Sequence, residues 1–251
     1  MKEAINIQMS TALRLFEPRG AQRLFEAMEE NPAIAPTHWG ESASLRDPYN
    51  REDILGYMRR CQEADLVGES LVLRRLAAPR YNLTMPASYQ PMVWIRLESM
   101  VKLEPESIPL YFDLGSRLAP ALRAEYGFVD VVDYDGDHLP SERGWQPFYP
   151  EQGPGGIRRR TFFGLRLLEL LGGAQVFDGS GLLVRPFDGG LEADIVDPPW
   201  TGPKAEVRVK QRAAMEVLRR TGVFGDYDEK KRYSVGPRWV PMQPTPKQLQ
   251  R

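Results

Sequence analysis

Short segments with strand character fall into two groups along the chain, and this arrangement most restricts the fold. Near the N-terminus, Ile5, Ile7 and Met9 alternate with polar residues, which is the period of a strand with one buried face. Further strand-like segments follow in succession at 71–76, 81–85 and 92–97. Because successive short strands joined by turns form antiparallel meanders, we expect an antiparallel sheet in the first half.

Helical segments lie between the groups of strands. The clearest covers 51–64, where the side chain of Asn50 can accept hydrogen bonds from the free amides of the first turn and so act as the N-cap. The apolar face of this segment includes Cys61, so we expect a buried structural thiol rather than a nucleophile. Apolar spacing predicts further helices over 19–30, 105–127 and 203–221.

The second half of the chain repeats parts of this outline. FVDVVDY (128–134) predicts a strand, TFFGLRLLELLGG (161–173) a short buried helix, and residues 174–196 three short strands with glycine turns. Strands in meanders with helices between them are typical of the α+β class. We therefore expect two similar lobes, each an antiparallel sheet or meander with helices packed on one face. The lobes cover 1–100 and 101–222, and an irregular basic tail covers 223–251.

The composition is that of an ordinary globular protein, with 42% hydrophobic and 27% charged residues in a chain of 251. No stretch approaches about 18 uninterrupted apolar residues, which argues against a membrane span. The N-terminus lacks the pattern of a signal peptide, and a single cysteine cannot form an intramolecular disulfide. We therefore expect a cytoplasmic protein.

Charge is unevenly distributed, although the formal net charge is only -1. Residues 201–251 contain 12 Lys and Arg against 5 Asp and Glu, and the rest of the chain is acidic. A basic tail can indicate affinity for nucleic acid, but KAEVRVKQRAAMEVLRRTG is at least as typical of a surface helix with its cations toward water. The basic tail alone is not specific for nucleic acid, and we do not expect nucleic acid to be the partner.

DVVDYDGDH (130–138) places four aspartates and a histidine within nine residues. It is consistent with a strand end and solvated turn, a metal site, or a recognition surface. A helix-loop-helix calcium site needs a glutamate at its twelfth position, where this chain has Gly144. A transition-metal site lacks ligands, because the only other histidine, His38, lies 100 residues away. We expect no metal and no cofactor.

The segment that follows, GWQPFYPEQGPGG, supports the interpretation as a recognition surface. It offers Trp145, Phe148 and Tyr149 beside the carboxylates. Aromatic anchors framed by charge are typical of protein–protein hot spots.

Motifs for other chemistry are mostly missing from the sequence. There is no G-x-S-x-G, no P-loop and no CxxC, and GPGGIRRR (153–160) lacks the preceding strand of a phosphate-binding loop. We therefore expect no catalysis. The alternative is a metal-dependent hydrolase or nucleotide-acting enzyme that uses the Asp130–His138 carboxylates. Trp39 is expected to anchor its loop to the core, and His38 to satisfy a backbone carbonyl.

Three stretches together resemble the immunity protein 52 family of bacterial polymorphic-toxin systems. They are PTHWGESASLRDPYNREDIL (36–55), the long helix of the second half, and GGAQVFDGSGLLVRPFDGGLEADI (172–195). The similarity extends to about residue 200 and rests on a histidine-tryptophan pair, a proline-tyrosine before a helix and glycine hairpins. The basic tail departs from this pattern.

The resemblance implies an α+β cytoplasmic antidote that binds a cognate toxin and has no reaction of its own. The toxin would be a nuclease delivered by a contact-dependent or type VI system. Carboxylates on the antidote could then mimic the phosphates that a nuclease groove binds. From this sequence we predict a toxin-binding site at Asp133, Asp135, Asp137, Trp145 and Tyr149.

Overall fold

The computed structural model describes residues 3–42, 46–64, 69–86, 93–99, 103–133, 148–228 and 232–241. The first half contains β1 (Glu3–Thr11), α1 (Pro18–Glu29), β2 (His38–Gly40), β3 (Asp47–Pro48), α2 (Arg51–Glu63), β4 (Ser70–Arg75), β5 (Tyr81–Pro86) and β6 (Val93–Ser99). The second half contains a 3-10 turn (Pro105–Ser107), α3 (Ile108–Ala121), β7 (Tyr126–Asp133), β8 (Phe148–Tyr149), β9 (Gly153–Pro154), β10 (Arg160–Gly164), α4 (Leu165–Leu171), a 3-10 turn (Ala174–Phe177), β11 (Leu183–Phe187), β12 (Gly190–Asp194), α5 (Lys204–Arg219), β13 (Asp226–Asp228) and β14 (Arg232–Ser234).

The strands of both halves join in one antiparallel sheet, in the order β11-β12-β10-β7-β1-β6-β5-β4-β2-β3. The predicted α+β class and its antiparallel strands are confirmed. The sheet continues across the expected boundary near residue 100, because β1 pairs with β6 on one side and with β7 on the other. Ile7, for example, lies opposite Val129. The two halves therefore share a single sheet.

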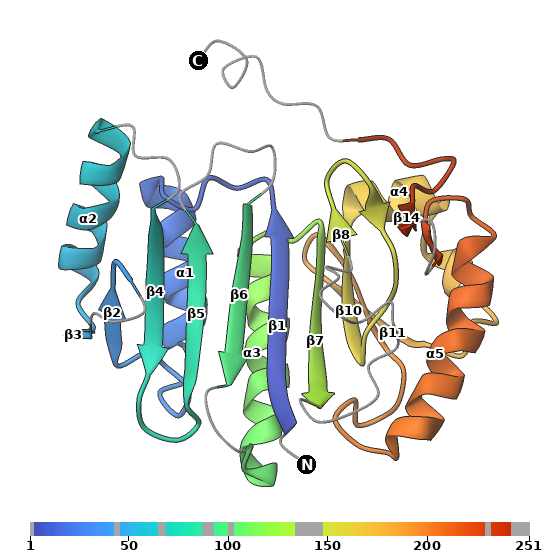
Figure 1. Cartoon of the computed structure of the whole chain (residues 1–251), viewed down its shortest axis with the longest axis horizontal. Coiled ribbons are helices and arrows are strands. Elements are labelled where there is room, and N and C mark those ends of the chain that lie inside the picture. Colours follow the sequence, from blue (N-terminus) through green and yellow to red (C-terminus); the bar gives the residue numbers. More distant parts are fainter. Residues whose placement is uncertain are drawn as a thin grey trace.

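The buried hydrophobic residues form two cores, which lie on opposite faces of the sheet where β7 and β10 pass between them. The first core combines the first half of the chain with α3, and the second core comes from the second half alone. Phe162 belongs to the first core and Phe163 to the second, although they are adjacent in β10. Successive side chains of a strand point to opposite faces, so one strand can contribute to both cores. Helices α1 and α3 cover the first face (Figure 1), and α4 and α5 contribute to the second core.

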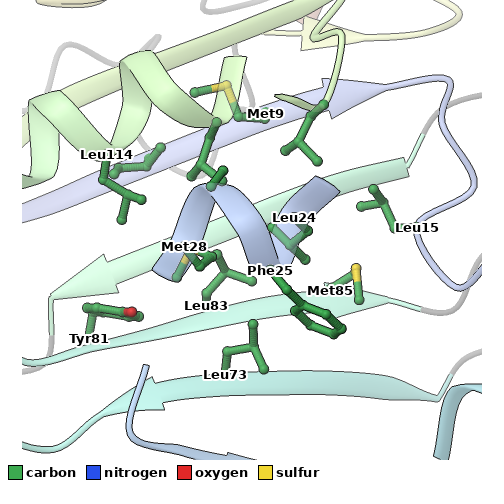
Figure 2. Close-up of a cluster of buried hydrophobic side chains, with 14 of the residues drawn as sticks. Met9, Leu15, Leu24, Phe25, Met28, Leu73, Tyr81, Leu83, Met85 and Leu114 are labelled. Carbon is green, nitrogen blue, oxygen red and sulfur yellow. The ribbon is translucent and has the colours of Figure 1, made fainter. Parts of the chain in front are cut away.

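Helix α1 shows how the apolar spacing of the sequence becomes packing. Leu24, Phe25 and Met28 are fully or almost fully buried and project toward β4 and β5, where they meet residues such as Leu83 and Met85 (Figure 2). Burying a side chain of this size stabilises a fold by about 1.5–3 kcal/mol. The outward face of α1 is polar, and it forms one wall of the charged groove described below.

Several local predictions are confirmed by the structure. The side chain of Asn50 accepts from the backbone N–H groups of Glu52 and Asp53 at the start of α2, and Cys61 is buried on the inner face of that helix. Trp39 is 6% exposed and packs against Tyr57, with 5.9 Å between ring centroids, so it anchors the loop as expected.

Other local predictions are wrong. Residues 161–163 belong to β10 rather than to a helix, and the helix begins only at Leu165. An uninterrupted apolar run does not distinguish a buried strand from a buried helix. Residues 174–177 form a 3-10 turn where a strand was expected, so this region contributes two strands, β11 and β12.

Helix α5 has the expected surface character. It buries Val207, Ala214 and Leu218 and exposes Lys210 and Arg212. The tail beyond it was expected to be irregular, but its described part contains the small hairpin of β13 and β14. None of the helices in the described ranges reaches the length and apolar character that crossing a membrane requires.

Candidate functional site

The predicted toxin-binding residues lie at the edges of the described ranges or outside them. Asp133 is the last residue of β7, opposite Glu3, and Tyr149 pairs with Gly153 in the β8–β9 hairpin. Asp135, Asp137 and Trp145 fall outside the described residues. The binding role of the five residues therefore stays a prediction.

Asp130, the first carboxylate of the alternative enzyme site, has an ionic partner. Its Oδ2 lies 3.6 Å from Nε of Arg158, and its Oδ1 accepts from the backbone N–H of Val131 at 3.0 Å. Among the described residues, no group of three or more His, Cys, Asp or Glu side chains is placed to hold a metal. His138 lies outside those residues, and His38 Nδ1 lies 2.9 Å from the Thr37 hydroxyl rather than at a backbone carbonyl.

The described part of the chain contains a charged groove of about 820 Å³ between α1, α3 and the β11–β12 turn, which we call the α1–α3 groove. Short side chains, including Ala27 and Ala121, leave space between the two helices. Arginines and carboxylates from four separate segments surround this space. The lining residues are Arg23, Glu26, Ala27, Glu29, Glu30, Arg51, Ser116, Arg117, Pro120, Ala121 and Asp188.

One wall of the groove is held by a two-point ion pair between Glu29 and Arg51. Glu29 Oε1 accepts from Arg51 Nε at 2.7 Å, and Oε2 accepts from Arg51 Nη2 at 2.5 Å. The hydroxyl of Tyr49 also donates to Oε1, at 2.5 Å. This arrangement ties the end of α1 to the start of α2.

The same contacts shift the titration of these groups. Partial burial raises the pKa of Glu29, but the hydrogen bonds from Arg51 and Tyr49 and the charge of Arg51 outweigh it, so the pKa lies below its ordinary value. Burial and the hydrogen bond to Glu29 raise the pKa of the Tyr49 hydroxyl. Glu29 is therefore held as a carboxylate and Tyr49 as a neutral donor.

Arg117 on α3 differs from Arg51, because its guanidinium is buried without a hydrogen-bond acceptor. All three side-chain nitrogens are inaccessible to solvent, and none has a hydrogen-bond partner in the described part of the chain. The nearest carboxylate oxygen in an ion pair, Asp113 Oδ2, lies 3.4 Å from Nε, and the Asp113 side chain is 57% exposed. Arg117 is thus a buried cation with one weak, solvent-screened neighbour.

A second ionic cluster adjoins the groove through Ser116. The Ser116 hydroxyl donates to Glu192 Oε2 at 2.5 Å and accepts from Arg160 Nη1 at 2.8 Å. Arg160 in turn donates to Asp194, and Arg185 donates to Glu192 at 2.7 Å. The charges of this cluster are matched within the protein, so we assign it a structural role in fixing one side of the groove.

What the site offers chemically is a fixed arrangement of charge. Its helical walls are held by the two ionic clusters, and it presents both signs of charge in a fixed pattern. Such a pattern selects a partner by electrostatic complementarity. This groove was not predicted from the sequence, although Arg117, four positions after Asp113 on an otherwise apolar helix, was a visible signal.

Comparisons with known proteins add little to this description. No family model matches the chain, and no curated protein matches it. Among solved structures, the chain is similar to the Pseudomonas aeruginosa T6SS protein PA0821, with a TM-score of 0.47 and 16% sequence identity. The match covers 91% of this chain and 85% of that chain. A likeness this distant assigns no function to the chain.

Proposed function

We propose that the protein binds and neutralises a protein toxin, as an antidote without a reaction of its own. The α1–α3 groove carries this proposal, because it combines space for a polypeptide segment with fixed charges of both signs. The resemblance of the sequence to the immunity protein 52 family supports the same function. The toxin we propose is a nuclease effector of a type VI or contact-dependent system, neutralised in the cytoplasm.

The charges of the groove favour a protein segment over nucleic acid. Four carboxylates line it against three arginines, and one of these arginines, Arg51, is already paired with Glu29. A phosphate backbone would meet more negative than positive charge there, whereas nucleic-acid binding depends on neutralising phosphates. A protein segment that carries both charges would meet partners of opposite sign.

Co-expression tests this function directly. The chain would be produced together with the product of the gene immediately upstream of its own, and growth would be measured alongside a pull-down from the same lysate. We expect rescue of growth and a 1:1 complex. If the upstream product is toxic and the chain neither rescues growth nor binds it, the proposed function is wrong.

A charge-reversed variant tests the role of the groove. Glu30 and Asp188 are exposed on its rim, so Glu30→Lys with Asp188→Lys changes the charge pattern without disturbing the core. We expect this variant to lose protection. The matched control is Glu63→Lys with Asp178→Lys, which makes the same charge change at exposed positions outside the groove and should still protect. Equal protection by both variants would exclude the groove as the binding site.

A further inference from the structure

We propose that Arg117 is the residue of the α1–α3 groove that receives a carboxylate from the bound partner; this rests on the toxin-binding function proposed above. Arg51, Arg160 and Arg185, which belong to the ionic clusters around the groove, donate to carboxylates within the protein. Among the arginines of the described ranges, only Arg117 has buried nitrogens that lack an acceptor. Arg117 is therefore the buried cation of the groove that has no hydrogen-bond acceptor among the described residues.

An unpaired buried cation is unfavourable for the protein on its own. Removing a guanidinium from water without supplying acceptors costs free energy, and natural cores pair their buried charges for this reason. Residues that lower stability without an internal compensation tend to occur at functional sites. Arg117 fits this description because Asp113, its ionic neighbour among the described residues, has a side chain that is mostly in solvent.

The chemistry of the guanidinium indicates what it would bind. Its planar fork matches the two oxygens of a carboxylate and can donate to both at once. The side chain lines the groove, with 12% of its surface exposed, while its nitrogens lie beneath. Binding therefore requires the head of this long side chain to turn into the groove, where an incoming carboxylate would supply the missing acceptor.

The charges on the rim of the groove indicate which charges the partner segment carries. Glu30 and Asp188 are exposed there, and neither has an ion pair within the described residues. They would repel an isolated polyanion but would attract a Lys or Arg beside the incoming carboxylate. The occupant that fits is a protein segment with an Asp or Glu next to a basic residue.

Two measurements on Arg117→Met test this inference: the melting temperature of the free protein and the affinity for the purified, catalytically inactive toxin. Methionine keeps the length of the side chain and removes the charge. We expect the melting temperature to rise by about 2–4 °C, because the variant no longer buries an unpaired cation. We expect affinity for the toxin to fall at least about tenfold.

Matched variants separate charge from shape. Arg117→Lys keeps the charge but removes the fork, so its affinity should fall between those of the native chain and Arg117→Met. Arg212→Met removes an exposed cation from α5, outside the groove, and should change neither quantity. The Asp and Glu residues of the toxin would then be replaced one at a time by Asn and Gln. The partner of Arg117 is the residue whose replacement lowers affinity for the native chain but not for Arg117→Met.

The outcomes distinguish this inference from the function on which it rests. Failure of the native chain to bind the toxin would reject the antidote function itself. Normal binding by the native chain and affinity within twofold for Arg117→Met would reject only the role of Arg117. A lower melting temperature for Arg117→Met would also overturn the inference, since it would show that Arg117 is satisfied inside the free protein.

Discussion

Arg160 donates to both carboxylate oxygens of Asp194, with distances of 2.8 Å from Nε to Oδ1 and 2.8 Å from Nη2 to Oδ2. The Asp194 side chain is fully buried and that of Arg160 is 8% exposed. Arg185 donates to the same carboxylate. Asp194 on β12 thus compensates one arginine on each of the two strands that flank β12, whereas Arg117 has no hydrogen-bond acceptor among the described residues.

Asp194→Asn removes this compensation and should destabilise the protein by about 3–5 kcal/mol, because it leaves the buried guanidinium of Arg160 with too little negative charge beside it. Chemical denaturation would measure the free energy of unfolding. Asp178→Asn changes an exposed aspartate in the same way and should have an effect below about 0.5 kcal/mol. A loss below about 1 kcal/mol for Asp194→Asn would contradict the role given to this cluster.

Glu29 should make stability depend on pH. Its pKa is lower in the folded protein than the ordinary value of 4.5, so its contribution is present above that value and is lost as the pH falls through the folded pKa. Glu29→Gln should therefore be less stable than the native chain at pH 7, and the difference should shrink on acidification. Unfolding curves at several pH values would show this. A difference that stays constant or grows in acid would disprove it.

Gly115 allows α3 to approach the sheet closely. A Cβ atom at this position would lie 2.3 Å from Cγ2 of Val129 in β7. Gly115→Ala should therefore destabilise the protein by about 1–3 kcal/mol through overpacking. Adding Val129→Ala should recover part of this loss, so the double variant should be more stable than the sum of the single effects predicts. Strict additivity would show that the two positions do not collide.

The predicted toxin-binding residues between the end of β7 and β8 offer a separate test of toxin binding. Replacing Asp133, Asp135 and Asp137 with Asn should weaken binding, mainly at low salt, because dissolved salt screens the attraction between the charges of two partners. Trp145→Ala and Tyr149→Ala should weaken it at all salt concentrations if these aromatic residues are anchors. Titration calorimetry at two ionic strengths would distinguish the two effects. Unchanged affinity in all variants would exclude this segment as a contact.

Local structure was largely predictable wherever one face of an element is buried and the other is wet. The alternation around Ile7 predicted β1, and Asn50 before a run of helix formers predicted the start of α2. The prediction failed at residues 161–163, where the strand is buried on both faces and has no alternation to read. The burial of Cys61 followed from its place on the apolar face of a helix.

The candidate site was not predictable in the same way, because its parts come from distant segments. Glu29, Arg51, Arg117 and Asp188 meet only after α1 and α3 have packed on the sheet and the β11–β12 turn has closed beside them. Each residue by itself is an ordinary surface charge in the sequence. That Arg117 is buried without an acceptor depends on its neighbours in space.

The sequence by itself determined the α+β class, most strands and helices, the helix cap and the buried thiol, since these depend on residues within a turn or a strand of one another. Only the tertiary structure decided that β1 joins both halves in one sheet, that Phe162 and Phe163 enter opposite cores, and that a groove lies between α1 and α3. These features arise from strand pairing and helix packing between segments far apart in the chain. The periodicity of a single segment carries no information about which partner it will meet.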